Sequence, residues 1–285
     1  MYMQPAMFRH SILLLSGSLF LHLSVQAALL QQCTNSANYT SGSQFQTNLN
    51  LLLQSLLSNA PTRKGFFNTS VGADPNKVYG LAQCSGDLST QECQTCLYNS
   101  TLDARQLCPN QKEVVLRHSK CILHYSNSQS FSQVDKDLHV LYHVNKVPDT
   151  DHFNEQLSNF VNNLSTVAAS SPSRFDYGIT DYSAFAKMYG MVNCIQVLSP
   201  GDCLDCLRSL IDYIPICCYG NQGGHYFTTT CDLRFEIYPF FSSSITTQAP
   251  PPVALGSPPA ETPPQANTGN SESGLRPFDL SHSSI

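Results

Sequence analysis

The sequence predicts an α+β fold in two tandem domains, each built from helices and strands and cross-linked through cysteines. The first observation is a repeat, because five cysteines recur at one constant offset: those at 84, 93, 96, 108 and 121 correspond to those at 194, 203, 206, 218 and 231. The second is that helix-like and strand-like segments follow in the same order in both copies. A duplicated unit of about 105 residues has the size of an ordinary domain.

The first helix of each copy is predicted from apolar periodicity. Apolar residues recur at spacings of three and four between residues 45 and 57, namely Phe45, Leu49, Leu52, Leu53 and Leu56. This spacing places them on one face of an α-helix. The segment SQFQTNLNLLLQSLLSNA (43–60) corresponds to DHFNEQLSNFVNNLSTVA (151–168), so we expect an amphipathic helix near the start of both domains.

The second helix of each copy is predicted from its first residues. Ser89 followed by Glu92 matches a capping box, in which each residue satisfies a backbone N–H of the other. In the second copy, Ser199 precedes Pro200, and proline is well tolerated at the first position of a helix. Both signals indicate a helix that begins just before the Cys-x-x-Cys pair.

The strands are predicted from composition. VVLRHSKCILHYS (114–126) and HYFTTTCDLRFEIYPF (225–240) are rich in β-branched and aromatic residues. Such runs are typical of strands, and each fits a hairpin or a short antiparallel sheet.

The two ends of the chain differ from the repeats. Residues 1–27 have a weakly basic lead, an apolar run and a small-x-small pattern ending at Ala27, which is typical of a secretory signal peptide. Residues 244–285 contain eight prolines among small and polar residues, which predicts a disordered, Pro-rich tail. No second apolar stretch approaches the length of about 18 residues that a spanning helix needs, so no membrane span is expected in this chain.

All twelve cysteines follow the predicted cleavage site. Secretory compartments are oxidising, so we expect these cysteines to be paired. The Cys93-x-x-Cys96 pair also suits a redox centre or half of a zinc site. Each copy has one such pair, whereas a zinc site needs four converging ligands, and Cys84 offers Cys93 a partner just upstream. A disulfide scaffold is therefore favoured, and neither a metal nor a cofactor is expected.

Surface chemistry limits the partners. Four sequons predict N-glycans, at Asn38, Asn68, Asn99 and Asn163. The formal net charge is −5 and no run of Lys and Arg exceeds two residues, which argues against nucleic acid or an anionic membrane as a partner. We expect a secreted, extracellular glycoprotein.

The cysteine spacing resembles that of a plant family. Cys84-x8-Cys93-x2-Cys96, with YGLAQC ending at Cys84, is followed by a cysteine twelve residues further on and by another thirteen residues after that. This pattern is similar to the ginkbilobin-homologous, or salt-stress-response/antifungal, domain of land plants. The tandem arrangement, with QGG (222–224) and CDLRFEIYPF (231–240), resembles cysteine-rich receptor-like kinase ectodomains, cysteine-rich repeat secretory proteins and plasmodesmata-located proteins. The resemblance implies a first domain at 28–145 and a second at 146–243.

The resemblance also implies that each domain packs two helices on an antiparallel sheet and has three disulfides. In the first copy these are Cys33–Cys108, Cys84–Cys93 and Cys96–Cys121, and in the second Cys194–Cys203 and Cys206–Cys231. The second copy has no equivalent of Cys33, and Cys217 stands beside Cys218 instead. A Cys217–Cys218 bridge, two free thiols and an intermolecular bridge remain open.

A sugar site is known from this family. Ginkbilobin binds mannose through an Asn after the first cysteine, an Arg seven residues after the fifth and a Glu five residues after the last. The first copy has Thr34, Val115 and Ser126 at these places, whereas the second matches only at Glu236 and has His225 at the Arg position. The resemblance therefore does not support mannose binding by the same triad, and Glu236 and His225 remain the candidate ligand contacts.

Three aromatic residues, Tyr219, Tyr226 and Phe227, are candidate platforms for a sugar ring. Packing in the core or in a hairpin is the alternative interpretation, and the sequence favours it.

The favoured function is a secreted, non-catalytic recognition module of the plant apoplast in stress or defence signalling. It resembles a receptor-like kinase ectodomain without membrane helix and kinase, and the motifs of a kinase are absent from the sequence. The expected partner is an unknown extracellular protein or glycan, with association with receptor-like kinases. Whether the chain is a truncated receptor product or a dedicated secreted protein stays open. The alternative is an antifungal, lectin-like carbohydrate-binding protein.

An enzyme is the rival class. Asp87, Glu92 and either His118 or His124 could converge in the fold. No G-x-S-x-G, H-E-x-x-H or paired-carboxylate motif is present, however, so the sequence does not favour an enzyme.

Overall fold

The computed structural model describes residues 30–33 and 38–242. The predicted signal peptide (1–27) and the predicted tail (244–285) lie outside these residues. Within the described part of the chain, none of the helices combines the length and the apolar character needed to cross a bilayer.

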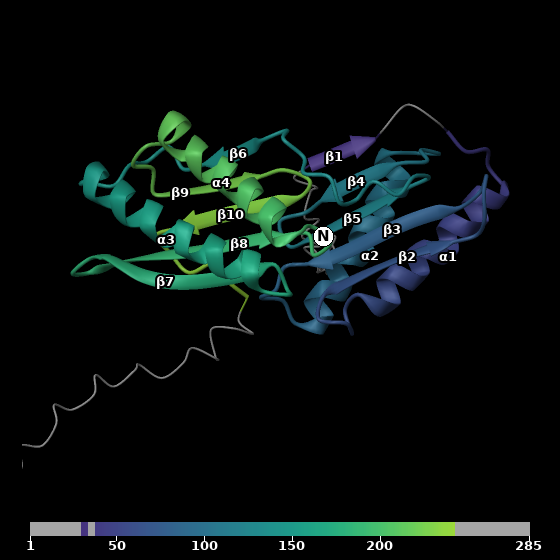
Figure 1. The fold of residues 1–285 in the computed structure, drawn as a ribbon, viewed down its shortest axis with the longest axis horizontal. Coiled ribbons are helices and arrows are strands. Elements are labelled where there is room, and N and C mark those ends of the chain that lie inside the picture. Colours follow the sequence, from purple (N-terminus) through teal and green to yellow (C-terminus); the bar gives the residue numbers. More distant parts are fainter. Residues whose placement is uncertain (1–29, 34–37, 243–285) are drawn as a thin grey trace, which may run out of the picture. The chain divides into compact units, whose positions relative to one another are not determined.

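The first domain pairs a five-stranded antiparallel sheet with two helices (Figure 1). The strand order is β1-β4-β5-β3-β2, with every neighbouring pair antiparallel. The elements are β1 (Leu30–Cys33), α1 (Gln44–Asn59), β2 (Phe66–Val71), β3 (Val78–Cys84), α2 (Thr90–Leu107), β4 (Val114–Arg117) and β5 (Cys121–Ser126).

The second domain repeats this architecture, with the strand order β6-β9-β10-β8-β7. The elements are β6 (His139–Tyr142), α3 (Thr150–Ser170), β7 (Phe175–Ser183), β8 (Ala186–Cys194), α4 (Pro200–Cys217), β9 (Gly223–Phe227) and β10 (Cys231–Glu236). Strand β6 pairs with β9, although it precedes residue 146, where the sequence places the start of the second domain. Sheet membership would put the boundary between Ser126 and His139.

The helices begin where the sequence predicts. At the start of α2, the Ser89 side chain accepts from the Glu92 amide at 3.3 Å, and the Ser89 amide donates to Glu92 Oε2 at 2.9 Å, which confirms the capping box. At the start of α4, Ser199 Oγ accepts from the Asp202 amide at 3.1 Å, ahead of Pro200. Both helices therefore start just before a cysteine pair, which fixes the direction of the sulfur atoms.

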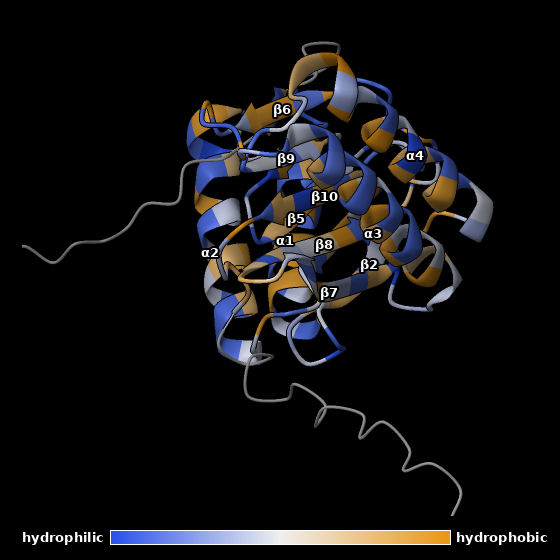
Figure 2. Cartoon of the chain, turned by 90° about the vertical axis from the view of Figure 1, so that its left-hand side faces the viewer, coloured by the Kyte–Doolittle hydropathy of each residue, from blue (hydrophilic) through white to orange (hydrophobic). Residues whose placement is uncertain are grey.

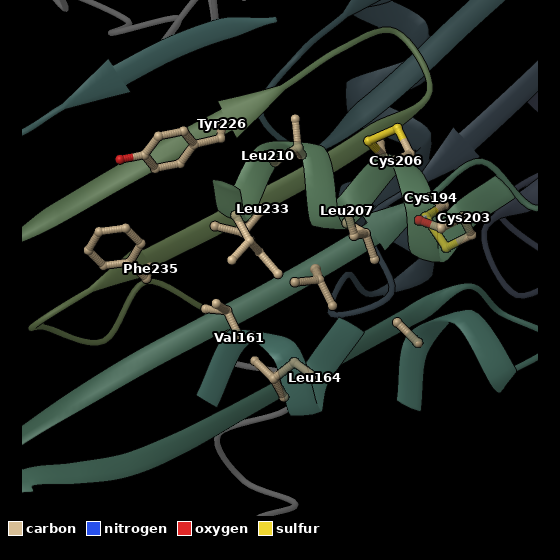
Figure 3. Packing of buried hydrophobic residues seen from close by; sticks show 14 of the residues in the cluster. Val161, Leu164, Cys194, Cys203, Cys206, Leu207, Leu210, Tyr226, Leu233 and Phe235 are labelled. Carbon is tan, nitrogen blue, oxygen red and sulfur yellow. A yellow bond between two sulfur atoms is a disulfide. The ribbon is translucent and has the colours of Figure 1, made fainter. Parts of the chain in front are cut away.

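In each domain the two helices cover one face of the sheet. Figure 2 colours the chain by hydropathy, and Figure 3 shows the resulting core of the second domain. Buried positions of α3, such as Val161 and Leu164, pack with Leu207 of α4 and Leu233 of β10. The predicted α+β class, with two helices on an antiparallel sheet in each tandem domain, is thereby confirmed.

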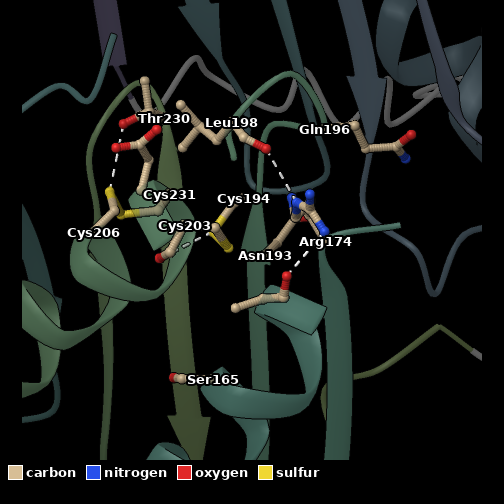
Figure 4. The surroundings of a disulfide bond; sticks show 12 residues. Ser165, Arg174, Asn193, Cys194, Gln196, Leu198, Cys203, Cys206, Thr230 and Cys231 are labelled. Atoms are coloured by element: carbon tan, nitrogen blue, oxygen red, sulfur yellow. Dashed lines mark hydrogen bonds between the residues drawn. A yellow bond between two sulfur atoms is a disulfide. The ribbon is translucent and has the colours of Figure 1, made fainter. Parts of the chain in front are cut away.

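Six disulfides join the elements, and no described cysteine is free. Each domain has two bridges between helix and sheet, and the full set is Cys33–Cys108, Cys84–Cys93, Cys96–Cys121, Cys194–Cys203, Cys206–Cys231 and Cys217–Cys218. Figure 4 shows the second domain, where Arg174 donates to the carbonyls of Leu198 and Ala169 at 3.2 and 2.9 Å beside these bridges. The neighbours Cys217 and Cys218 pair with each other where the first domain has Cys33–Cys108.

The sheet faces turned away from the helices meet each other. Leu81, Val115 and Ile122 of the first sheet belong to the same apolar cluster as the core of the second domain. Between them Gln83, which is 2% exposed, donates to Asn193 Oδ1 at 3.1 Å and to the Cys194 carbonyl at 2.8 Å. Because buried amides lose water on folding, these bonds specify how the two sheets dock.

Candidate functional site

A cleft of about 300 Å³ opens beside the end of the second sheet. It lies between the edge strand β6 and the strands β9 and β10, and the first domain contributes one residue. The lining residues are Ser119, Leu141, Tyr142, His143, Gly224, His225, Arg234, Glu236 and Tyr238. We refer to it as the Glu236 cleft.

Glu236 is the carboxylate of this cleft. It ends β10 and is only 3% exposed. Its Oε1 atom accepts from Nε and Nη2 of Arg234 at 3.0 and 2.9 Å. A Cβ atom at Gly223 would collide with Glu236 Oε2, so the glycine makes room for the carboxylate. A buried carboxylate needs a partner such as Arg234, because an unpaired charge would be costly to desolvate.

His143 stands opposite Glu236. Its Nε2 atom lies 3.1 Å from Glu236 Oε2 and 3.3 Å from the Tyr238 hydroxyl. When Nε2 carries a proton, it donates to the carboxylate and completes the bonding of a buried oxygen. His143 is held in place because its amide donates to the Gly223 carbonyl at 3.0 Å.

The position of His143 follows from the repeat. Cys33 pairs with Val114 in the first sheet, and Tyr142 pairs with Gly224 in the second. Val114 and Gly224 are equivalent, because they are separated by the same offset as the repeated cysteines. Tyr142 therefore takes the place of Cys33, and His143 takes the place of the residue after it. Sequence reasoning missed His143, because the missing cysteine removed the marker for this position.

His225, the second candidate contact, lines the cleft but is already engaged. The residue is 7% exposed, and Nε2 lies 2.8 Å from Asp232 Oδ2. Arg117 of the first domain donates to the same oxygen at 3.2 Å. Burial raises the pKa of Asp232, but His225, Arg117 and Arg234 outweigh it and leave that pKa below its ordinary value. The Nε2 atom of His225 is therefore engaged at the interface between the two domains.

The exposed aromatic residues at the cleft are not the expected ones. Tyr226 and Phe227 are 0% and 2% exposed, so they pack in the core and offer no platform. Tyr219 is exposed but lines a different groove. The rim of the Glu236 cleft instead has Tyr142 and Tyr238, which are 53% and 42% exposed.

Two of the three equivalent places in the first domain are described by the structure, and both are buried. Val115 is buried and packs against the second domain, and Ser126 is fully buried. Thr34 lies outside the described residues. Here Val115 contributes to domain docking instead.

Of the four residues considered for catalysis, the two carboxylates share one partner, and each histidine lies beside a different acidic residue. Ser242 donates to both Asp87 and Glu92, so these two carboxylates share a partner. His118 lies 3.3 Å from Asp103, and His124 lies 3.9 Å from Glu113. Among the described residues, no group of three or more His, Cys, Asp or Glu side chains is arranged to hold a metal ion.

Of the four predicted glycan acceptors, Asn38, Asn68 and Asn163 are exposed and Asn99 is half-buried. Glycosylation at these sites stays a prediction.

Comparison with known proteins places the chain in a family. An antimicrobial ginkbilobin-2-like protein of Castanea crenata is 34% identical over 81% of this chain and 95% of that protein. The cysteine-rich repeat secretory protein 38 of Arabidopsis thaliana is 33% identical over 76% of this chain and 87% of that protein. A third, the cysteine-rich receptor-like protein kinase 25 of Arabidopsis thaliana, is 32% identical over 92% of this chain, which spans only 41% of the kinase.

The fold is that of a solved structure. The tandem DUF26 ectodomain of the Arabidopsis thaliana cysteine-rich receptor-like protein PDLP8 superposes with a TM-score of 0.63 at 22% identity, over 75% of this chain and all of that one. The family model described as salt stress response/antifungal matches residues 32–128 and again 142–238. These two matches cover more than half of the sequence, and the chain belongs to the salt stress response/antifungal family.

Proposed function

We propose that this protein is a secreted, non-catalytic recognition module of the plant apoplast, which binds an extracellular ligand in the Glu236 cleft and acts in stress or defence signalling. One observation supports it most: a buried carboxylate, held by Arg234 and His143, lies in an open cleft with an aromatic rim. Polar groups held in fixed positions beside exposed aromatic rings are typical of ligand sites.

Binding is favoured over catalysis because of how Glu236 is held. A general acid or base must exchange protons readily with its substrate. Glu236 accepts two hydrogen bonds from one guanidinium, so Oε1 is already engaged and acts as a fixed acceptor. The relatives are named as secretory, antimicrobial and receptor-like proteins, which supports an extracellular role. The receptor-like kinase among them supports association of the module with receptor-like kinases.

A second candidate function is an antifungal, lectin-like protein. The observation that favours it is that the three places of the family's sugar triad, occupied here by His143, His225 and Glu236, all line one cleft. Sugar hydroxyls need both donors and acceptors, and the cleft supplies both beside two exposed tyrosines.

The first experiment is a glycan-array screen of the secreted, oxidised protein, with mannose displays included. The variant Tyr142→Ala/Tyr238→Ala removes the aromatic rim, together with the Tyr238 hydroxyl beside His143, and keeps the pair of Glu236 and Arg234. Tyr213→Ala, which changes a partly exposed tyrosine of α4, is the matched control. Binding that the rim variant loses and the control keeps would support the lectin. A silent array would exclude it.

The second experiment tests recognition of a protein. A photo-crosslinking residue placed at Tyr142, and separately at Tyr213, is activated in apoplastic fluid. Specific labelling from position 142 would support the cleft as the ligand site. Equal labelling from both positions would count against it.

A further inference from the structure

A second groove, which shares no lining residue with the Glu236 cleft, lies between the two helices of the second domain. It has a volume of about 450 Å³. Its apolar part is formed by Leu157 of α3 with Ile211, Ile214 and Pro215 of α4. We call it the α3–α4 groove.

Its polar lining is acidic. Asp151, Glu155 and Asp212 all line the groove and are exposed, and none of its described lining residues is basic. Tyr219 donates to Asp151 Oδ1 at 2.7 Å. This hydrogen bond, followed by burial and by the nearby charges of Asp151 and Asp149, raises the pKa of Tyr219.

The first domain has the equivalent groove, between α1 and α2, with a volume of about 300 Å³. It is lined by Leu49, Asn50, Ala104 and Arg105, among others. Arg105 of α2 crosses it, since Nη2 donates to Asn50 Oδ1 of α1 at 3.3 Å. The first domain thus supplies a guanidinium at its groove from its own chain.

The repeat shows which residues correspond. The offset of the cysteines relates Ala104 and Arg105 to Ile214 and Pro215, and the alignment of the first helices relates Leu49 and Asn50 to Leu157 and Ser158. The second groove therefore keeps the apolar floor but has proline where the first has arginine. It also gains the three carboxylates, which have no internal cation in the groove to pair with.

We propose that the α3–α4 groove binds an arginine side chain of a partner polypeptide, in the place that Arg105 occupies in the first domain. The aliphatic stem would lie on the apolar floor, and the planar guanidinium would donate to the carboxylates at the rim. This site shares no residue with the Glu236 cleft, so it does not depend on the function proposed above.

The probe is a fluorescein-labelled peptide, Gly-Leu-Arg-Leu-Gly, and its binding to the secreted, glycosylated protein is measured by fluorescence anisotropy. The matched peptide has citrulline, which keeps the shape of arginine and lacks its charge. We expect the arginine peptide to bind and the citrulline peptide to bind at least about tenfold more weakly, with affinity falling as salt screens the exposed charges.

Two sets of variants locate the site. Pro215→Arg should place a guanidinium in the groove, as in the first domain, and abolish peptide binding. Pro215→Ala removes the proline without adding a charge and should retain peptide binding. Asp151→Asn/Glu155→Gln/Asp212→Asn should reduce affinity by about tenfold, because each exposed charge pair contributes little by itself. Asp205→Asn, an exposed carboxylate of α4 outside the groove, is the control and should change nothing.

Several results would overturn the proposal. The first is no binding at peptide concentrations up to about 1 mM, which we take as the weak limit of specific association. The second is equal binding of the citrulline peptide, and the third is undiminished binding to the Pro215→Arg variant. Spermidine that competes as well as the peptide would also overturn it, because the groove would then be a general cation site. Tyr142→Ala/Tyr238→Ala should leave peptide binding intact, so failure of one site is distinguishable from failure of the other.

Discussion

One carboxylate, Glu92, shows how much a single residue does in this fold. Its Oε2 atom accepts from the amide and hydroxyl of Ser89 at 2.9 and 2.7 Å, which starts α2. Ser242, which follows the last strand of the second domain, donates to the same carboxylate at 2.8 Å. The bonds to Ser89 and then to Ser242 lower the pKa of Glu92 to about 2. A helix cap thereby also anchors the end of the other domain.

We predict that Glu92→Gln lowers the free energy of unfolding at pH 7 by about 1 kcal/mol, the size of a cap contribution, because the side chain is partly exposed and solvent screens its charge. The ionised form stabilises the fold above the ordinary pKa of 4.5, and this contribution is lost as the pH falls toward 2. Urea unfolding between pH 7 and 2 should therefore show the variant and the wild type converging in acid. Asp205→Asn is the control, and a difference that persists at pH 2 would contradict the prediction.

The contact of helix with sheet depends on a glycine in each domain. A Cβ atom at Gly80 of β3 would lie 2.6 Å from Leu52 Cδ2, and one at Gly190 of β8 would lie 2.5 Å from Phe160 Cε1. Both residues sit at the same place in the repeat, equally far before Cys84 and Cys194. Here the first helix of each domain approaches the sheet too closely for any side chain, which sets the depth of the core.

We predict that Gly190→Ala destabilises the protein by about 1–3 kcal/mol, because an added methyl group must displace Phe160 and Leu164 in a packed core. The control is Gly201→Ala in the first turn of α4, where the nearest atom to an added Cβ is Ser199 Oγ at 3.9 Å. Alanine also suits a helix better than glycine does, so the control should be neutral or stabilising. Thermal and urea unfolding of both variants would check this, and equal losses would contradict it.

At the scale of the whole molecule, a buried charge network joins the two domains. Arg117, which is 4% exposed, donates to Asp232 Oδ2 at 3.2 Å and to the Thr229 carbonyl at 3.4 Å. His225 contacts the same carboxylate oxygen. Burial lowers the pKa of Arg117, and the Asp232 carboxylate opposes that effect. Because the network joins side chains of both domains, we expect it to couple their folding.

We predict that Arg117→Met costs about 3–5 kcal/mol, because it removes the guanidinium that contacts the buried Asp232 carboxylate and leaves His225 on the same oxygen. Arg117→Met/Asp232→Asn should cost less than the sum of the two single changes, since no unpaired charge remains. Calorimetry of the wild type should show a single transition for both domains. Additive losses in the double-mutant cycle, or two separate transitions in the wild type, would contradict this account.

The sequence alone determined the features that depend on local pattern. The repeat of the cysteines, the apolar face of α1, the capping box at Ser89 and the hairpins β4–β5 and β9–β10 are all confirmed. Each depends on residues close together in the chain, where periodicity and spacing carry the signal. The short run HVLY (139–142) forms β6, but four residues are too few to distinguish a strand from a loop in the sequence.

The tertiary structure decided what depends on distant residues. Edge strands β1 and β6 form because β4 and β9 offer unpaired backbone groups, and pairing of β6 with β9 is what brings His143 to Glu236. The exposure of each aromatic ring depends on which face of its strand the helices cover. Tyr226 is therefore buried, whereas Tyr142 lies at the rim of the cleft. The Glu236 cleft and the α3–α4 groove could be read only from the fold, because side chains far apart in sequence meet only once the chain has closed on itself.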